Sequence, residues 1–140
     1  MNYKKLVENA KEPTRGTPGS AGWDLCAIEE VIVPPNGTAS KVRTGIAMEI
    51  PEGFFGLLVP RSSMGRKGVR LSTGASIIDS DYRGEILAFF WNDSNTTYTI
   101  KPGDRVAQIV LIPYGQTSMA EVEELSETDR SGGGFGSTGR

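Results

Sequence analysis

The stretch GIAMEI at residues 45–50 places large apolar side chains at every second position. This alternation is typical of a β-strand that buries one face, because successive side chains of a strand point to opposite faces of the sheet. A period of two recurs in EILAFFW at 85–91 and in VAQIVL at 106–111. We therefore predict β-strands at all three places.

Turn-forming clusters separate these stretches and indicate many short strands. The 140-residue chain contains 18 glycines and 8 prolines, which is more than an average domain contains. Turn residues gather in five clusters: PPNG (34–37), PEG (51–53), DYRG (81–84), NDSN (92–95) and KPGD (101–104). Short strands with turns at this spacing predict an all-β protein, built as a β-sandwich or barrel.

Helical signals are few. The N-terminal stretch MNYKKLVENAK (1–11) fits a short helix or an opening strand. Ser62 and Ser63 are suitable caps for one helical turn that runs to Lys67, and Gly65 argues against a longer helix.

The composition limits the classes of function. The length suits one domain, and a formal net charge of −2 argues against direct binding of nucleic acid. The apolar runs are too short to cross a membrane and none resembles a signal peptide, so we expect a soluble intracellular protein, cytoplasmic or nuclear.

The chain has no histidine and one cysteine, Cys26. The lack of histidine excludes Ser-His-Asp and Cys-His catalytic groups and the usual zinc ligand sets. A carboxylate is then the simplest general base. Cys26 cannot form an intrachain disulfide, and we expect it to act as a small buried hydrophobe.

The C-terminal end has a composition of its own. The stretch SGGGFGSTGR (131–140) has five glycines and follows Arg130. Such a tail is commonly a flexible end, but it can also wrap a phosphate chain while Phe135 stacks on a base. We divide the chain into a single β-domain at 1–129 and a flexible, glycine-rich arm at 130–140.

Two internal segments carry groups suited to phosphate chemistry. PRSS at 60–63 combines a guanidinium with two hydroxyls at the start of the expected helical turn, and this combination fits either a solvated turn or an anion site. In GASIIDSDYRGEI (74–86), Asp79 follows two isoleucines, so we expect a partly desolvated carboxylate that can activate water. Taken alone, DSDYRG is more often only a turn.

Two more polar residues stand inside apolar strands. Gln108 in KPGDRVAQIV either faces solvent or supplies a functional amide. Asp24 in SAGWDLCA is either turned outward or placed to hold the water shell of a metal ion. Magnesium keeps several waters when it binds phosphates, and it is the metal that this second interpretation favours.

Taken together in this order, the five segments resemble the motifs of the homotrimeric dUTPases, the deoxyuridine triphosphate nucleotidohydrolase family. The resemblance covers about residues 11–139. The matching segments are AGWDLCA (21–27), PRSSM (60–64), SIIDSDYRG (76–84), PGDRVAQ (102–108) and RSGGGFGSTG (130–139). Ser76 and Ser131 stand where the family usually has glycine.

The resemblance implies a jelly-roll-like β-fold assembled as a homotrimer with shared active sites, over which a neighbour's C-terminal arm closes. It implies hydrolysis of dUTP to dUMP and pyrophosphate by attack of water on the α-phosphorus, with Mg²⁺ as the metal ion. This reaction would keep uracil out of DNA and supply dUMP for thymidylate synthesis.

The resemblance also implies a role for each matching residue. Asp79 would be the catalytic base, Asp24 would reach Mg²⁺ through water, and Tyr82 would pack on deoxyribose and leave no room for a ribose 2′-hydroxyl. The other implied substrate-binding residues are Thr73, Gly74 and Ser76 near uracil, Arg61, Ser62, Ser63 and Gln108 at the phosphates, and Arg130, Phe135, Gly136, Ser137 and Thr138 in the arm.

Two alternatives stay open at this point. One is a dCTP deaminase, which has a similar fold, although Phe89 stands where that enzyme has its catalytic glutamate. The other is a non-catalytic nucleotide-binding protein, for which we would expect a lost base or a lost arm.

Overall fold

The structure, a computed structural model that describes residues 1–134, is built almost entirely of strands. The stretches 45–50, 85–91 and 106–111 form strands as predicted, and the N-terminal stretch opens as a strand. The strands are β1 (Asn2–Lys5), β2 (Gly22–Cys26), β3 (Val31–Val33), β4 (Ser40–Arg43), β5 (Ile46–Glu49), β6 (Phe54–Pro60), β7 (Val69–Leu71), β8 (Ser76–Ile78), β9 (Leu87–Asn92), β10 (Tyr98–Ile100) and β11 (Arg105–Pro113). One helical turn, α1 (Ser62–Gly65), connects β6 to β7.

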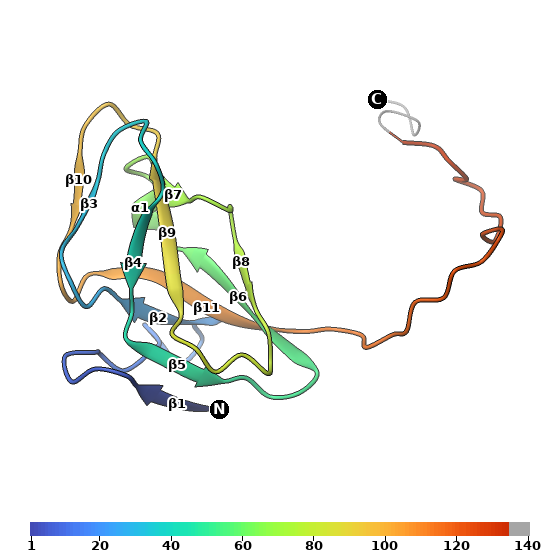
Figure 1. Cartoon of the computed structure of the whole chain (residues 1–140), viewed down its shortest axis with the longest axis horizontal. Helices are drawn as coiled ribbons and strands as arrows, with labels where there is room; N and C mark the ends of the chain where they lie inside the picture. The colour runs from blue at the N-terminus through green and yellow to red at the C-terminus, as the bar shows by residue number, and fades with distance from the viewer. Residues whose placement is uncertain (135–140) are drawn as a thin grey trace.

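Two antiparallel sheets form the main layers (Figure 1). The larger sheet has the order β2-β11-β6-β8 and the smaller one the order β4-β9-β7. Two more pairs, β1-β5 and β3-β10, complete the strand arrangement of the described residues. The sheets do not close on themselves, so of the two predicted forms the fold is the sandwich.

Alternate side chains of both sheets share one core. Leu58 of β6 and Ile109 of β11 belong to the same buried cluster as Val42 of β4 and Phe90 of β9. Burial of a side chain of this size stabilises the fold by about 1.5–3 kcal/mol. Phe89 points the other way and is 42% exposed. The alternation read from the sequence therefore reports which face of each strand meets the core.

Cys26 ends β2 and is buried with 8% of its surface exposed, as expected for a small hydrophobe. Burial raises the pKa of its thiol above the ordinary value. The thiol therefore stays protonated at neutral pH.

The chain leaves the sheets after β11. Residues 114–134 contain no strand or helix, and nearly all of their side chains are exposed. Figure 1 shows this extension running well away from the sandwich. It includes Arg130, whereas Phe135, Gly136, Ser137 and Thr138 lie outside the described residues. No helix within residues 1–134 has the length and apolar character needed to cross a membrane.

Candidate active site

Three of the five segments meet at one end of the larger sheet. Asp24 on β2 lies directly opposite Gln108 on β11, and Gln108 lies opposite Val59 near the end of β6. Arg61 follows β6, and its backbone N–H donates to the carbonyl of Val106 at 3.3 Å. Antiparallel pairing thus brings an acid, an amide and a guanidinium together from positions far apart in the sequence.

Asp24 is buried between two arginines. Its side chain is 9% exposed, its Oδ1 lies 3.3 Å from Nε of Arg61, and its Oδ2 accepts from Nη1 of Arg105 at 3.2 Å. A carboxylate in such a place needs partners, because burial of an unpaired charge is costly. Asp24 is therefore not the outward-facing acid that was one of its two sequence interpretations.

The two serines after Arg61 are exposed and do not cap α1. The helix begins at Ser62, its N-cap residue is Arg61, and no side chain makes a capping hydrogen bond. The predicted capping role is therefore wrong, because the backbone enters the turn one residue earlier than we expected. Met64 is buried and anchors the turn. The hydroxyls of Ser62 and Ser63 are consequently available to a ligand.

The third segment forms β8 and the turn that follows it. The hydroxyls of Thr73 and Ser76 lie 3.1 Å apart at the start of this segment, across a turn that contains Gly74. Asp79 follows β8 and is exposed in the single chain. Ile77 is 65% exposed, so the burial we expected around Asp79 is absent from the isolated chain. Ile78 is partly buried against the core of this chain, but Ile77 does not belong to that core.

Tyr82 lies over the turn after Asp79. Its hydroxyl donates to the carbonyl of Glu85 at 3.0 Å, and its backbone N–H donates to the carbonyl of Asp79 at 3.2 Å. A Cβ on Gly84 would overlap the tyrosine ring, so glycine is needed for this close approach. The hydrogen bond of the hydroxyl holds the ring over this turn, although 43% of Tyr82 is exposed.

Asp79 and Tyr82 border a small surface hollow of about 240 Å³. Its other walls are mainly apolar and come from Ile77, Ile78, Glu85, Leu87 and Phe89. A hollow lined by aromatic and aliphatic side chains can hold a flat ring, and a carboxylate at its edge can act as a general base beside that ring.

The isolated chain keeps Asp79 away from Arg61. Ile78 pairs with Gly56 on β6, so Asp79 lies beside the start of that strand, whereas Arg61 follows its end. With a rise of about 3.4 Å per residue, the six steps from Phe55 to Arg61 span about 20 Å. The single chain thus brings Asp24, Arg61 and Gln108 together but leaves Asp79 and Tyr82 elsewhere.

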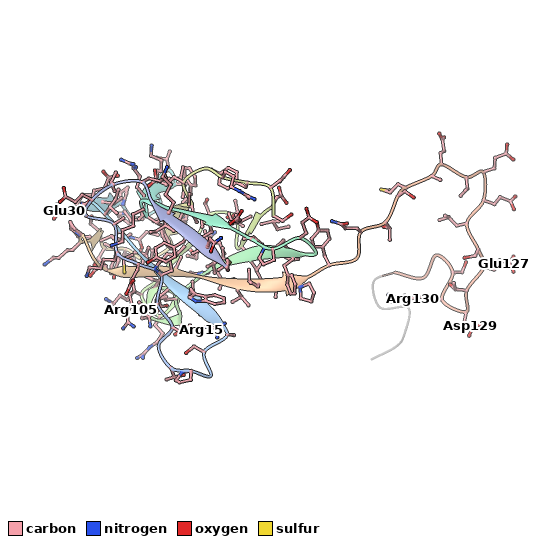
Figure 2. The ribbon with its side chains drawn as sticks, turned by 90° about the horizontal axis from the view of Figure 1, so that it is seen from below. Arg15, Glu30, Arg105, Glu127, Asp129 and Arg130 are labelled. Atoms are coloured by element: carbon pink, nitrogen blue, oxygen red, sulfur yellow. The ribbon has the colours of Figure 1, made fainter. Side chains whose placement is uncertain are left out.

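Arg130 is separate from both groups. Its Nε donates to the carbonyl of Gly133 at 3.0 Å within the extension. Figure 2 shows Arg130 far from Arg105, at the distant end of the chain that leaves the sheets.

The described residues offer no direct metal cage, because no three His, Cys, Asp or Glu side chains gather within 1–134. Mg²⁺ does not need such a cage, because it keeps several waters and binds through one or two carboxylates together with substrate phosphates. Asp24 suits such a role, since a carboxylate has about four acceptor positions and the two arginines leave some for water.

Sequence reasoning missed Arg105, which was quoted within KPGDRVAQIV but given no role. The structure places it against Asp24, a residue 81 positions away. The signal that could have found it is the buried acid itself, because two carboxylate oxygens in an apolar strand need cations.

The chain is similar to known proteins over nearly its whole length. The dUTPase family model matches residues 8–139. The chain belongs to the dUTPase family. It is therefore an enzyme, and the resemblance inferred from the five segments is confirmed.

Individual dUTPases cover almost the whole chain. The deoxyuridine 5′-triphosphate nucleotidohydrolase of Paramecium bursaria Chlorella virus 1 is 47% identical over 137 residues, covering 97% of this chain and 95% of that protein. The corresponding protein of Oryza sativa subsp. japonica is 44% identical over 139 residues, covering 99% and 80%.

Solved dUTPase structures confirm the fold. That of Staphylococcus bacteriophage 80alpha with dUPNHPP has a TM-score of 0.90 at 29% identity, covering 99% of this chain and 98% of that one. A variant of the dUTPase from phage phi11 of S. aureus, described with a structural Mg(II) ion, has a TM-score of 0.79 at 28% identity, covering 88% and 96%.

Proposed function

We propose that this dUTPase hydrolyses dUTP to dUMP and pyrophosphate by attack of water on the α-phosphorus. The observation that carries the proposal is the pair of half-sites: Asp24, Arg61 and Gln108 at one end of β6, and Asp79 with Tyr82 beside the other. The half-site around Arg61 suits a phosphate chain. The half-site around Tyr82 suits a nucleoside, with the Asp79 carboxylate at its edge as the general base. Relatives named deoxyuridine 5′-triphosphate nucleotidohydrolase support the choice of substrate.

Asp79 acts as the general base. Its carboxylate takes a proton from water as the water oxygen bonds to the α-phosphorus. The bond from that phosphorus to the bridging oxygen of the β-phosphate breaks, and pyrophosphate leaves with the bonding electron pair. Positioning and neutralisation of charge do most of the work in such a displacement, so no covalent intermediate is needed.

Arg61, Ser62, Ser63 and Gln108 hold the phosphates. A guanidinium binds phosphate oxygens with two parallel N–H groups, and the exposed hydroxyls and the amide add neutral donors. Asp24 orients Arg61 and would hold Mg²⁺ through water. When bound, Mg²⁺ neutralises the charge that accumulates on the phosphate oxygens.

The nucleoside occupies the hollow beside Tyr82. Thr73, Gly74 and Ser76 lie near the uracil, and the fixed tyrosine ring packs on deoxyribose so that a 2′-hydroxyl has no room. This steric exclusion selects dUTP over UTP.

Separation of the half-sites supports active sites at subunit boundaries, and the homotrimer of this proposal provides such boundaries. A span of about 20 Å along β6 is too long for one triphosphate to contact Asp79 and Arg61 of the same chain. A neighbouring subunit supplies the missing half, and the exposed Ile77 is then covered in the assembly.

The chain divides, in this proposal, into the β-domain at 1–129 and the arm at 130–140, which closes over a neighbour's site. Arg130 binds phosphate oxygens there. Phe135 stacks on uracil, and Gly136, Ser137 and Thr138 complete the phosphate contacts. In the cell, cytoplasmic or nuclear, the reaction keeps uracil out of DNA and supplies dUMP for thymidylate synthesis.

A product assay with dUTP, dCTP, dTTP and UTP in the presence of Mg²⁺ tests the proposal. We expect dUMP and pyrophosphate from dUTP and little turnover of the other three. Release of ammonia from dCTP would identify a deaminase instead. Binding of dUTP without any product would identify a non-catalytic nucleotide-binding protein.

A further inference from the structure

A second hollow of about 310 Å³ lies beside the phosphate half-site. Arg61 and Ser63, two proposed phosphate contacts, are part of its lining. Lys67 and Arg105, neither of which has a role in the proposed function, line the same space. The hollow therefore adds cations next to the place where the phosphate chain binds.

The three cations of this lining differ in their partners. Arg61 and Arg105 both contact Asp24, which offsets part of their charge. Asp104, the acid in the lining, accepts from the backbone N–H of Lys101 at 2.9 Å. Lys67 makes no ion pair with any acid in residues 1–134, so its full charge is available to an anion.

Tyr98 positions the Lys67 ammonium. Lys67 follows α1, and its backbone N–H donates to the carbonyl of Met64 at 2.9 Å. Its Nζ donates to the Tyr98 hydroxyl at 3.3 Å and lies 4.9 Å from the centre of the ring. Contact with an aromatic ring attracts a cation without neutralising it. Because the neutral Tyr98 already holds the Lys67 side chain in place, that side chain loses less conformational entropy when it binds an anion.

We propose that Lys67 is a further substrate-binding residue, which contacts the terminal phosphates of the substrate and the pyrophosphate product in the hollow it shares with Arg61 and Ser63. The inference rests on the proposed function for the identity of the substrate. A lysine ammonium is a compact point charge that binds phosphate oxygens in any orientation, which suits the end of a phosphate chain.

The test compares Lys67→Gln with Lys41→Gln. Lys41 is also an exposed lysine but lies on β4 in the other sheet, outside this hollow, so its variant loses the same charge elsewhere. For Lys67→Gln we expect the KM for dUTP to rise about three- to tenfold with kcat within about twofold, because a contact made equally in the ground and transition states changes KM alone. Lys67→Arg, which keeps the charge, should have a KM for dUTP close to that of the wild type.

Direct binding of inorganic pyrophosphate, measured by calorimetry, separates this inference from the proposed function. Lys67→Gln should weaken pyrophosphate binding by a similar factor, and Lys41→Gln should not. If the wild-type protein turns over dUTP but the KM and the pyrophosphate Kd of both variants match the wild type, the role of Lys67 is wrong and the proposed function stands. If the wild-type protein fails to turn over dUTP, the proposed function is wrong, while weaker pyrophosphate binding by Lys67→Gln alone still supports the anion site.

Discussion

Asp79 and Arg61 lie beside opposite ends of strand β6. Asp79 follows β8, whose Ile78 pairs with Gly56 near the start of β6, and Arg61 follows the last residue of β6. If every active site takes its base from one subunit and its phosphate-binding arginine from another, two different inactive variants can restore each other's activity. Two inactive variants cannot restore each other's activity if one chain supplies both groups of a site.

We therefore predict complementation between Asp79→Asn and Arg61→Gln. Each variant alone should be nearly inactive, while trimers refolded from an equal mixture should regain about a quarter of wild-type activity, since random assembly leaves one site in four with both groups intact. Activity is measured after refolding the variants separately and together. No gain on mixing would place both groups of a site in one chain.

Asp79→Asn alone should lower turnover by about 10²-fold or more, because an amide cannot take the proton from water. Binding of a non-hydrolysable dUTP analogue should change little, since no phosphate contact is lost. Asp81→Asn is the matched control, as Asp81 is an exposed acid in the same turn. Turnover near wild type in Asp79→Asn would assign the base to another group.

Asp24→Ala should destabilise the fold by about 1–3 kcal/mol, because it leaves two guanidinium groups without their carboxylate and removes a buried side chain. Asp93→Ala breaks the ion pair with Arg70, in which both side chains are 48% exposed, and should cost less than about 1 kcal/mol. Urea unfolding of both variants measures the difference. Equal losses would show that burial of Asp24 has no energetic consequence.

Tyr82→Ala should relax the choice between dUTP and UTP. The variant loses the ring that is fixed over Gly84, and so it loses the obstacle to a 2′-hydroxyl. The ratio of kcat/KM for the two nucleotides is the measurement, and Tyr82→Phe serves as the control that keeps the ring. An unchanged ratio in Tyr82→Ala would mean that another group senses the 2′-position.

Deletion of residues 130–140 should leave the β-domain folded, because the extension around Arg130 contributes nothing to the core cluster. We expect kcat/KM to fall by about 10²-fold or more, since the deletion removes Arg130 and Phe135 and opens the site to water. Circular dichroism and steady-state kinetics of the truncated protein test both parts. Full activity without the arm would make it only a flexible end.

The strands could be predicted from the sequence because one face of each meets the core, as at Phe90 in β9. The surroundings of Asp79 could not be predicted from the sequence. Two isoleucines before an acid give the same sequence pattern whether their own chain or another copy covers them. An acid in an apolar strand indicates that Asp24 needs cationic partners, but the sequence does not say which ones. Strands β2 and β11 come from distant parts of the sequence, and only their register sets Arg105 against Asp24.

Burial of the Cys26 thiol lowers its reactivity toward oxidants. The thiolate is the form that oxidants and disulfides attack, and burial keeps Cys26 in the protonated form inside β2. Mild oxidants that attack thiolates therefore find this thiol protonated and covered inside the sheet. The Cys26 thiol is thus protected from oxidation and disulfide exchange for as long as strand β2 stays in its sheet.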